Sequence, residues 1–275
     1  MIDGQRIIDA HTHFSGILYP RTQEERSAWY GEKELIASMD AWGIDVSIVS
    51  SIEPMRWHNW TSCGAEYSLA TEYGGNEKVA EAVENHGDRL VGSYVPNVFE
   101  PAKRIKDGIR RFVREYGFRQ IKLHPWLSGF PANAEELEPV YEAAAEVGVP
   151  ILYHSGTIPY TTPAQIFDMA MKYPDVTVIM GHAGKGDLCY DALAVASYAE
   201  NLFLDTCGQP NKVFLERCIA ELGPERVLFA SDWLGSIGKL PFRRLEVEAL
   251  NISESARTSI LCENAARLHQ LGGIG

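Results

Sequence analysis

Residues 134–154, AEELEPVYEAAAEVGVPILYH, contain the unit from which the fold can be argued. Over residues 134–147, apolar and charged residues recur with the period of an amphipathic helix. Gly148 is a residue type that commonly ends such a helix, and residues 150–154 after it form a short apolar run typical of a buried strand. The apolar face of the expected helix carries Leu137, Val140, Tyr141 and Ala144. This stretch therefore predicts a helix, a stop and a strand.

The same order repeats along the chain. The clearest other helix, Pro101–Tyr116, ends at Gly117 and is followed by another apolar run. The last strands follow one another in steps of about 25–31 residues, which is the size of a βα unit. Two more helices, Arg243–Asn251 and Ser253–Leu271, close the chain. The expected strands are Arg6–Thr12, Val46–Ile52, Leu90–Pro96, Arg119–His124, Pro150–His154, Val176–His182, Leu202–Asp205 and Val227–Asp232.

Eight such units in one chain predict an α/β fold, a single (β/α)8 TIM barrel that spans residues 1–275 as one domain. A doubly wound open sheet is the alternative. Side-chain alternation favours the barrel: in the fourth strand Ile121 and Leu123 share one face, whereas Gln120, Lys122 and His124 share the other, which would be the interior. Barrel enzymes carry their chemistry at the carboxyl ends of the strands, so we expect the site there.

Composition excludes several other classes of protein. The chain of 275 residues is 45% hydrophobic, enough for a large core, and its net charge of −12 argues against nucleic-acid binding. The five cysteines show no C-x-x-C spacing and indicate reduced thiols. Neither an apolar signal region nor a membrane-spanning run is evident. We expect a cytoplasmic enzyme with a small-molecule substrate and no membrane partner, which forms a homo-oligomer, namely a dimer.

Histidines gather at the expected strand ends, and this is the strongest chemical signal in the sequence. Two of them, His11 and His13, share one face of the first strand, because side chains alternate along a strand. The fifth strand ends at His154 and the eighth at Asp232. Three imidazoles and a carboxylate make a ligand set for zinc or a similar divalent ion, with one position left for water. Structural roles, as a buried histidine or a turn aspartate, are the alternatives for His154 and Asp232.

Other residues near these ends have less defined roles. His182, in the GHAG segment after the sixth strand, could be a metal ligand, a general acid or base, or an electrophile for a substrate carbonyl. Asp9 lies one step deeper than His11 and is expected to orient an imidazole. Cys207 is interpreted as packing, because nothing near it in sequence would activate a thiol.

These segments together resemble a known family. The segments IDAHTH (8–13), IKLHP (121–125), GHAG (181–184), SDW (231–233) and ENAARL (263–268) are similar to the amidohydrolase superfamily, over residues 7–268. They are closest to its amidohydrolase-related branch, which includes aminocarboxymuconate-semialdehyde decarboxylase. The resemblance implies one metal ion, zinc or alternatively manganese, held by His11, His13, His154 and Asp232, and it implies that His182 assists the chemistry.

Four residues are expected to contact the substrate: Arg56, Lys122, His124 and Trp126. Arg56, on the loop after the second strand, could pair with a carboxylate in bidentate fashion. Lys122 has three possible roles: an anion contact, a carboxylated bridge between two metals as in dinuclear relatives, or a structural partner of a carboxylate such as Asp9. Aromatic residues in the strand-end loops suggest a mostly apolar, ring-containing substrate.

Two reactions agree with this site. The first expectation is a hydrolase of a small amide, ester or lactone, in which a metal-bound water attacks, Asp232 accepts its proton and His182 polarises the carbonyl. The alternative is a non-oxidative decarboxylase that acts on a small, aromatic or unsaturated carboxylic acid. A barrel without catalytic activity is a third possibility, which five intact residues of catalytic type argue against.

Overall fold

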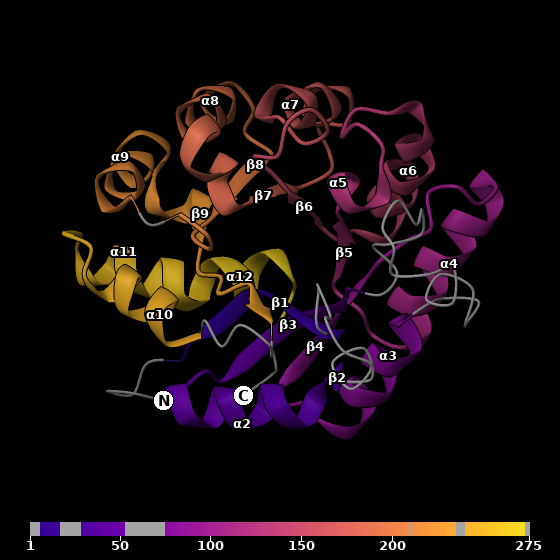
Figure 1. Ribbon diagram of the computed structural model, residues 1–275, viewed down its shortest axis with the longest axis horizontal. Helices are drawn as coiled ribbons and strands as arrows, with labels where there is room; N and C mark the ends of the chain where they lie inside the picture. Colours follow the sequence, from indigo (N-terminus) through magenta and orange to yellow (C-terminus); the bar gives the residue numbers. More distant parts are fainter. Residues whose placement is uncertain (1–5, 17–28, 53–74, 210, 235–239, 273–275) are drawn as a thin grey trace, which may run out of the picture.

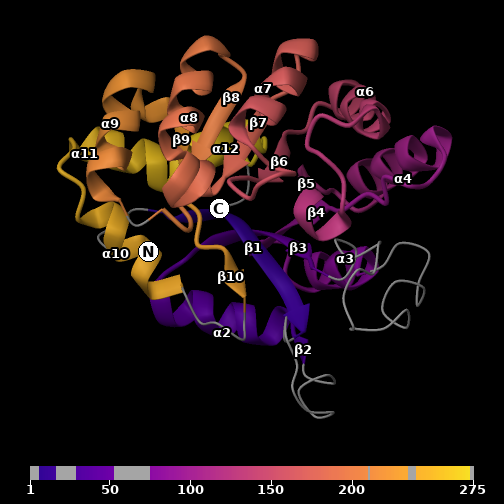
Figure 2. The ribbon, with the colours of Figure 1, turned by 45° about the horizontal axis from the view of Figure 1, so that its top comes forward.

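Helices surround a curled sheet of parallel strands in a TIM-barrel-like α/β fold (Figure 1). The structure, a computed structural model, describes residues 6–16, 29–52, 75–209, 211–234 and 240–272. In this part of the chain no helix is both long and apolar enough to span a membrane. Figure 2 shows β1 within the sheet, between β10 and β3.

The strands follow one another in a nearly sequential order. Parallel pairing runs along the path β10-β1-β3-β4-β5-β6-β7-β8-β9, and β2 adds an antiparallel pairing to β1. From β4 to β9, helices of the outer layer lie in the connections between neighbouring strands. The strands are β1 (Ile8–Gly16), β2 (Trp29–Tyr30), β3 (Val46–Ser51), β4 (Leu90–Tyr94), β5 (Gln120–Leu123), β6 (Ile151–His154), β7 (Val178–Gly181), β8 (Leu202–Asp205), β9 (Val227–Leu228) and β10 (Trp233–Leu234).

Two strands differ from the sequence prediction. Only the first two residues of the expected strand Val227–Asp232 form a strand, β9, and a second short strand, β10, begins after it at Trp233. Asp232, directly before β10, has a left-handed backbone (φ 54°) that interrupts extended structure. The intervening residues still bond to β1, through Ala10 N to Phe229 O (3.1 Å) and Asp232 N to His11 O (2.9 Å). The first strand runs on to Gly16, where it pairs with β2, so the H-x-H pair lies inside the strand and does not end it.

The helices form the outer layer. The predicted helix 101–116 is α4, which Pro101 and Tyr116 cap, and the predicted helix 253–271 is broken by a π-helical turn, η5. The α-helices are α2 (Glu32–Trp42), α3 (Asn76–Asn85), α4 (Ala102–Glu115), α5 (Pro125–Ser128), α6 (Glu138–Val147), α7 (Pro163–Lys172), α8 (Lys185–Tyr198), α9 (Lys212–Leu222), α10 (Leu240–Glu248), α11 (Glu254–Thr258) and α12 (Asn264–Leu268). Short turns are η2 (Glu135–Leu137), η3 (His182–Gly184), η4 (Pro224–Arg226) and η5 (Ser259–Glu263).

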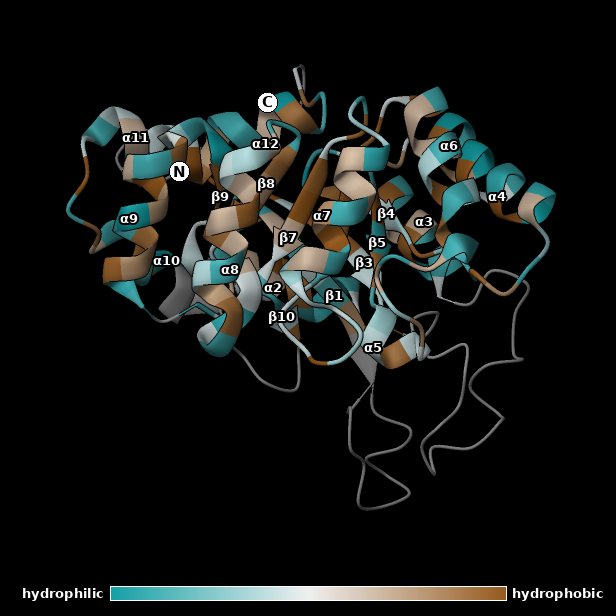
Figure 3. Cartoon of the chain, turned by 90° about the horizontal axis from the view of Figure 1, so that it is seen from above, coloured by the Kyte–Doolittle hydropathy of each residue, from teal (hydrophilic) through white to brown (hydrophobic). Residues whose placement is uncertain are grey.

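Two apolar clusters confirm the alternation read from the sequence. One cluster lies between sheet and helices and includes Ile121 and Leu123, as predicted. The other is formed by the opposite faces of the strands and by residues after the last turn, and it consists of Ile8, Ala10, Val46, Ile48, Val91, Leu152, Ile179, Phe203, Leu228, Ala265 and Leu271. Figure 3 shows the matching pattern, with hydrophobic strands inside and helices that turn hydrophilic faces outward. Burial on both faces is what fixes the register of these strands.

Candidate active site

Three side chains converge from the two halves of the chain. The Nε2 atoms of His11 and His13 lie 3.0 Å apart. The Oδ1 atom of Asp232 lies 3.3 Å from Nε2 of His13 and 3.7 Å from Nε2 of His11. Both imidazoles are buried, whereas the Asp232 side chain is 22% exposed. The cluster therefore has one side that solvent reaches.

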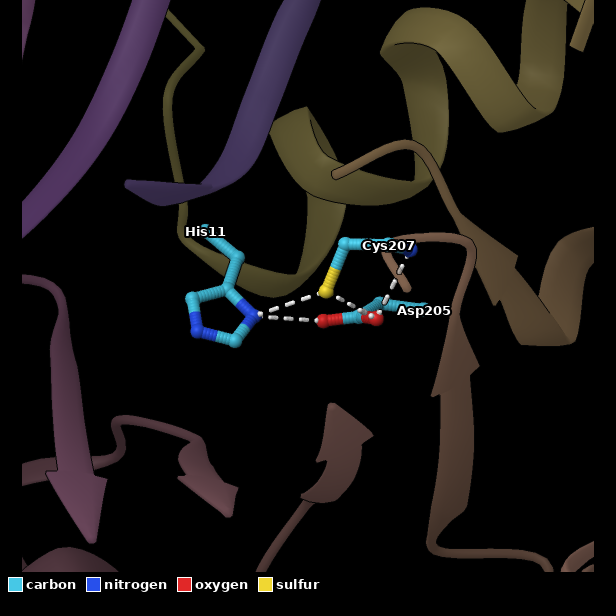
Figure 4. A group of neighbouring side chains, drawn as sticks. All are labelled: His11, Asp205 and Cys207. Atoms are coloured by element: carbon cyan, nitrogen blue, oxygen red, sulfur yellow. Dashed lines mark hydrogen bonds and ion pairs between the residues drawn. The ribbon is translucent and has the colours of Figure 1, made fainter. Parts of the chain in front are cut away.

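The rings of the H-x-H pair are held from behind. Nδ1 of His11 lies 2.8 Å from Oδ2 of Asp205, as Figure 4 shows, and Nδ1 of His13 lies 2.8 Å from Oγ of Ser50. Each ring therefore uses one nitrogen for a protein partner and turns the other into the cluster, which is the usual arrangement of a metal-binding histidine.

The donor atoms suit a divalent ion. Two ligand atoms that each lie about 2.0–2.2 Å from one ion are about 3–3.5 Å apart in tetrahedral or octahedral geometry. The separations of 3.0, 3.3 and 3.7 Å between the nitrogen and oxygen atoms fall in or near this range. Imidazole nitrogen with carboxylate oxygen is a donor set for zinc or manganese. His11, His13 and Asp232 thus have the chemistry and the spacing to hold one.

His182 joins this group through an unusual backbone. Strand alternation would place it on the same face as Met180, which packs against the outer helices. β7 ends at Gly181, and His182 has φ 68°, so its ring lies inside. A ring nitrogen of His11, a ring nitrogen of His182 and a carboxylate oxygen of Asp232 lie there within 4.8 Å of one another. The left-handed turn therefore makes His182 part of the site.

His154 reaches the cluster through His182. Its Nδ1 lies 3.0 Å from Nε2 of His182, and its Nε2 lies 2.9 Å from Oγ1 of Thr157 and 3.0 Å from Nζ of Lys185. The ring also stacks on that of His124, with centroids 3.8 Å apart. The structure thus brings all four predicted ligands to one region. It also groups His182, which the sequence prediction did not count as a ligand, with His11 and Asp232.

Lys122 points into the centre of this cluster. Its side chain is fully buried, and Nζ lies 2.7 Å from Nε2 of His11. Burial lowers the pKa of Lys122 to about 8, despite the negative charges of Asp232 and Asp205 nearby. The predicted inward direction of Lys122 is confirmed by this contact. Asp9 is not its partner.

The other expected substrate contacts lie close by or outside the described residues. His124 caps the short helix α5 and accepts a hydrogen bond from Leu127 N at Nδ1 (3.3 Å). The ring of Trp126, on α5, lies 6.1 Å from that of His124. Arg56 falls outside the described residues.

Sequence reasoning missed three residues and assigned two wrongly. Asp205, Lys185 and Ser50 were not singled out, although Asp205 ends a strand and Lys185 directly follows the GHAG segment. Cys207 is not simple packing, since its Sγ lies 3.2 Å from Nδ1 of His182, 3.3 Å from Nδ1 of His11 and 3.0 Å from Oδ1 of Asp205.

Asp9 orients backbone and not an imidazole. Its carboxylate accepts hydrogen bonds from His11 N (3.2 Å), Ser231 N (3.0 Å) and Ser231 Oγ (2.5 Å). Burial raises the pKa of Asp9 to about 7. The imidazole-orienting role expected of Asp9 is taken by Asp205 on β8.

Burial keeps the histidines of the site neutral. It lowers the pKa of His13 and holds the pKa values of His11 and His154 well below the usual range, and it lowers the pKa of His182 to about 3. For Asp232 burial would raise the pKa, but the hydrogen bond from His13 and the nearby imidazoles outweigh it and hold the pKa well below its usual value. Neutral imidazoles and an ionised carboxylate are the states that bind a metal ion.

Backbone strain concentrates at the same place. Among the described residues, five that are not glycine have positive φ. Four lie beside the cluster, namely His182 (68°), Ala183 (43°), Lys185 (54°) and Asp232 (54°), and the fifth, Gln270 (54°), follows His269. Gly181 allows a close approach, because a Cβ there would lie 2.5 Å from Tyr153 O and 3.1 Å from Cε1 of His11. Each strained residue costs roughly 1–3 kcal/mol and persists where the surrounding structure enforces it, commonly at functional sites.

The chain belongs to the amidohydrolase family, whose sequence profile matches residues 8–271. A gamma-resorcylate decarboxylase from Rhodococcus jostii is 28% identical over 172 residues, which are 54% of this chain and 44% of that relative, less than half of its length. A second gamma-resorcylate decarboxylase, from Polaromonas sp., is 24% identical and is matched over 85% of both chains.

Solved structures share the fold. The 2,6-dihydroxybenzoate decarboxylase from Rhizobium has a TM-score of 0.77 and 17% identity, with 98% of this chain and 100% of that chain covered. A 5-carboxyvanillate decarboxylase from Novosphingobium aromaticivorans, with bound manganese, has a TM-score of 0.77 and 17% identity, with 97% of each chain covered. A dihydroxybenzoic acid decarboxylase from Polaromonas sp., with manganese and 2-nitroresorcinol, has a TM-score of 0.74 and 19% identity over 97% of each.

Proposed function

We propose that this chain is a metal-dependent, non-oxidative decarboxylase of a small aromatic carboxylic acid, built as one closed eight-stranded barrel domain. One observation carries the proposal: the donor atoms of His11, His13 and Asp232 converge beside two ammonium groups, those of Lys122 and Lys185. Metal-type donors next to cations suit a carboxylate substrate better than a neutral amide or lactone. The reactions of the relatives support this choice over the hydrolase expected first from the motifs.

The metal ligands are proposed as the sequence predicted them: His11, His13, His154 and Asp232. His182 is then the residue that moves a proton. The alternative is the opposite assignment, in which His182 binds the ion and His154 moves the proton, because ligand atoms of His11, His182 and Asp232 lie within 4.8 Å of one another. The metal content of the His154→Asn and His182→Asn variants distinguishes the two.

When bound, a divalent ion would supply positive charge for an oxygen of the substrate's carboxylate or of a hydroxyl beside it. The Lys185 ammonium, half-buried on α8, binds the other carboxylate oxygen, and Lys122 adds to the positive potential. Both contacts hold the carboxylate against the histidine cluster, and the apolar ring then faces Trp126 and the stacked ring of His124.

The reaction needs one proton at the ring carbon that bears the carboxylate. Neutral His182 contacts His154 through Nε2 and Cys207 through Nδ1, so it can give a proton from one nitrogen while it takes one at the other. Protonation of the carbon is followed by cleavage of its bond to the carboxylate. The bonding pair returns to the ring and carbon dioxide leaves.

Product analysis after metal loading tests the proposal. The full chain, loaded with zinc or with manganese, is incubated with 2,6-dihydroxybenzoate and 5-carboxyvanillate, with their methyl esters, and with a panel of lactones. We expect carbon dioxide and the decarboxylated arene from at least one acid, and no turnover by a His13→Ala control. Hydrolysis of esters or lactones without decarboxylation of any acid would overturn the proposal in favour of a hydrolase.

A further inference from the structure

Asp205, at the end of β8, is a buried carboxylate with every oxygen engaged. Its Oδ2 lies 2.8 Å from Nδ1 of His11, and its Oδ1 lies 2.7 Å from His182 N, 3.1 Å from Cys207 N and 3.0 Å from Cys207 Sγ. Figure 4 shows the carboxylate and the sulfur of Cys207 side by side, both facing the same ring nitrogen of His11. The side chain has 0% exposure, so protein groups alone satisfy it.

These contacts determine which nitrogen of His11 carries the proton. Burial raises the pKa of Asp205, but its Oδ1 accepts from two backbone N–H groups, which favour the ionised form. An ionised carboxylate only accepts hydrogen bonds, so Nδ1 of His11 is the donor to Asp205. On the other side of the ring, Nζ of Lys122 lies 2.7 Å from Nε2, and a charged ammonium only donates. Both partners therefore assign the same tautomer, with the proton on Nδ1. The lone pair of Nε2 then accepts from Lys122 and lies on the side of the ring that faces His13 and Asp232.

We propose that Asp205 is the positioning residue of the site: it fixes the metal-binding tautomer of His11 and, with its other oxygen, the left-handed turn that carries His182. The inference rests on the metal ligands proposed above. This role explains why one carboxylate contacts both Nδ1 of His11 on β1 and the backbone N–H of His182, the residue with φ 68° that follows β7. A single side chain thereby couples the ligand pair of the first strand to His182.

The substitution Asp205→Asn separates this role from mere packing. The donors at Oδ1 include two backbone N–H groups, which cannot become acceptors, so the asparagine oxygen stays with them. Its NH2 group then faces Nδ1 of His11, which must give up its proton or move away. A proton that shifts to Nε2 points at Lys122 and blocks that nitrogen as a ligand.

Asp9→Asn is the matched control. Asp9 is equally buried, but its partners are His11 N, Ser231 N and Ser231 Oγ, and no ring nitrogen. An asparagine oxygen can serve the two backbone donors while its NH2 donates to the hydroxyl oxygen. The same isosteric change therefore leaves the tautomer of His11 as it is.

The experiment combines the ¹⁵N NMR spectrum of histidine-labelled, metal-free full-length protein with titration by zinc alone. His11 is identified by its absence in His11→Gln. We expect the Nδ1–H tautomer in the wild type and in Asp9→Asn, and its loss in Asp205→Asn together with a zinc affinity that is about 10–100-fold weaker.

Two outcomes overturn the proposal: an Nε2–H tautomer of His11 in the wild type, or an Asp205→Asn variant with the same tautomer and zinc affinity as Asp9→Asn. Where Asp205→Asn does not fold, an Nε2–H tautomer of His11 in the wild type still overturns the proposal. Failure of the wild type to bind zinc or manganese would count against the proposed function alone, because the tautomer is measured without metal.

Discussion

Buried histidines at the two ends of the sheet have different kinds of partner. At the amino end, His269 follows α12 and lies under the sheet, with Nδ1 2.8 Å from Ala265 O and Nε2 2.8 Å from Oε1 of Gln120, the first residue of β5. At the carboxyl end, His11 faces His13, Lys122 and the carboxylate of Asp205. The first histidine meets neutral groups and the second meets ionisable ones.

The backbone differs in the same direction. The positive φ angles of His182, Ala183, Lys185 and Asp232 all belong to the carboxyl end. His269 itself has φ −99°, an ordinary value at the end of a helix, and a single residue after it, Gln270, has a positive φ of 54°. A buried histidine that only completes the core needs neutral partners and an ordinary backbone of its own, whereas a site for chemistry brings ionisable groups together and relies on its surroundings to hold them. The comparison predicts how variants at each end behave.

The largest effect is expected from loss of the donor set. Chelation, or His13→Ala, should lower kcat/KM by about a thousandfold or more, because a bound divalent ion contributes several kcal/mol to charge stabilisation. Steady-state kinetics with metal analysis measures this. Added zinc or manganese should restore the chelated wild type and leave His13→Ala inactive. Full activity of a metal-free preparation would show that the reaction does not need a metal ion.

His182→Asn should lower kcat by about two to four orders of magnitude and leave the metal content near that of the wild type, because proton transfer is lost while the ligands stay. His154→Asn is its counterpart and should lose the metal. Rapid chemical quench and metal analysis of the two variants give the comparison. Metal loss in His182→Asn with retention in His154→Asn would exchange the two roles.

Lys185→Met should raise KM for a carboxylic acid substrate by about 10–100-fold with a smaller change in kcat, since a charge-assisted hydrogen bond contributes about 1.5–3 kcal/mol. Lys185→Arg keeps the charge and should recover part of the affinity. Kinetics with the acid and with its neutral amide analogue as an inhibitor check the assignment. An equal loss of affinity for both compounds would show that the charge is not the reason.

The amino end should affect stability and not turnover. Burial lowers the pKa of His269 to about 4, against 6.5 for the free side chain. Between these values the unfolded chain takes up a proton that the folded protein does not, so the free energy of unfolding falls as pH drops from 6.5 towards 4, by up to about 3 kcal/mol from this residue. Above pH 6.5 the contribution is complete.

Urea unfolding of the wild type and His269→Gln across pH 4–7 measures that contribution. The slope of the unfolding free energy against pH should be smaller in the variant, by the equivalent of up to one proton taken up on unfolding. The kcat of the variant at pH 7.5 should match that of the wild type. Identical slopes would mean that His269 is not held neutral by burial. A fall in kcat at unchanged stability would show that His269 contributes to turnover, contrary to the predicted difference between the two ends.

The sequence predicted the parts of the fold that depend on local pattern. The alternation of Ile121, Lys122 and Leu123 placed Lys122 inside, and the helix 101–116 begins and ends within a residue of its prediction. The length of β1 could not be predicted, because the strand that extends it, β2, has two residues and no recognisable period. The split of the last strand depends on the φ angle of Asp232, which no propensity assigns.

The candidate site was predictable as a set of residues but not as a network. Strand ends identified His11, His13, His154, His182 and Asp232. The direction of His182 comes from a left-handed turn in which alternation fails. The contact between His11 and Asp205 joins residues 194 apart in sequence, and Cys207 and Lys185 take their roles from such contacts. Local reasoning cannot pair groups across that distance, so it treated Cys207 as packing.

The position of β1 between β10 and β3 has a consequence for biosynthesis. His11 and His13 leave the ribosome well before the segment that their strand bonds to. That segment contains Phe229 and Asp232, and Asp9 bonds to Ser231, 222 residues further along. Contacts of such sequence separation form late in folding. The nascent chain therefore carries the H-x-H pair without the carboxylate of Asp232 until this later segment has been made, and a product truncated before residue 229 would have His11, His13 and His154 but never Asp232.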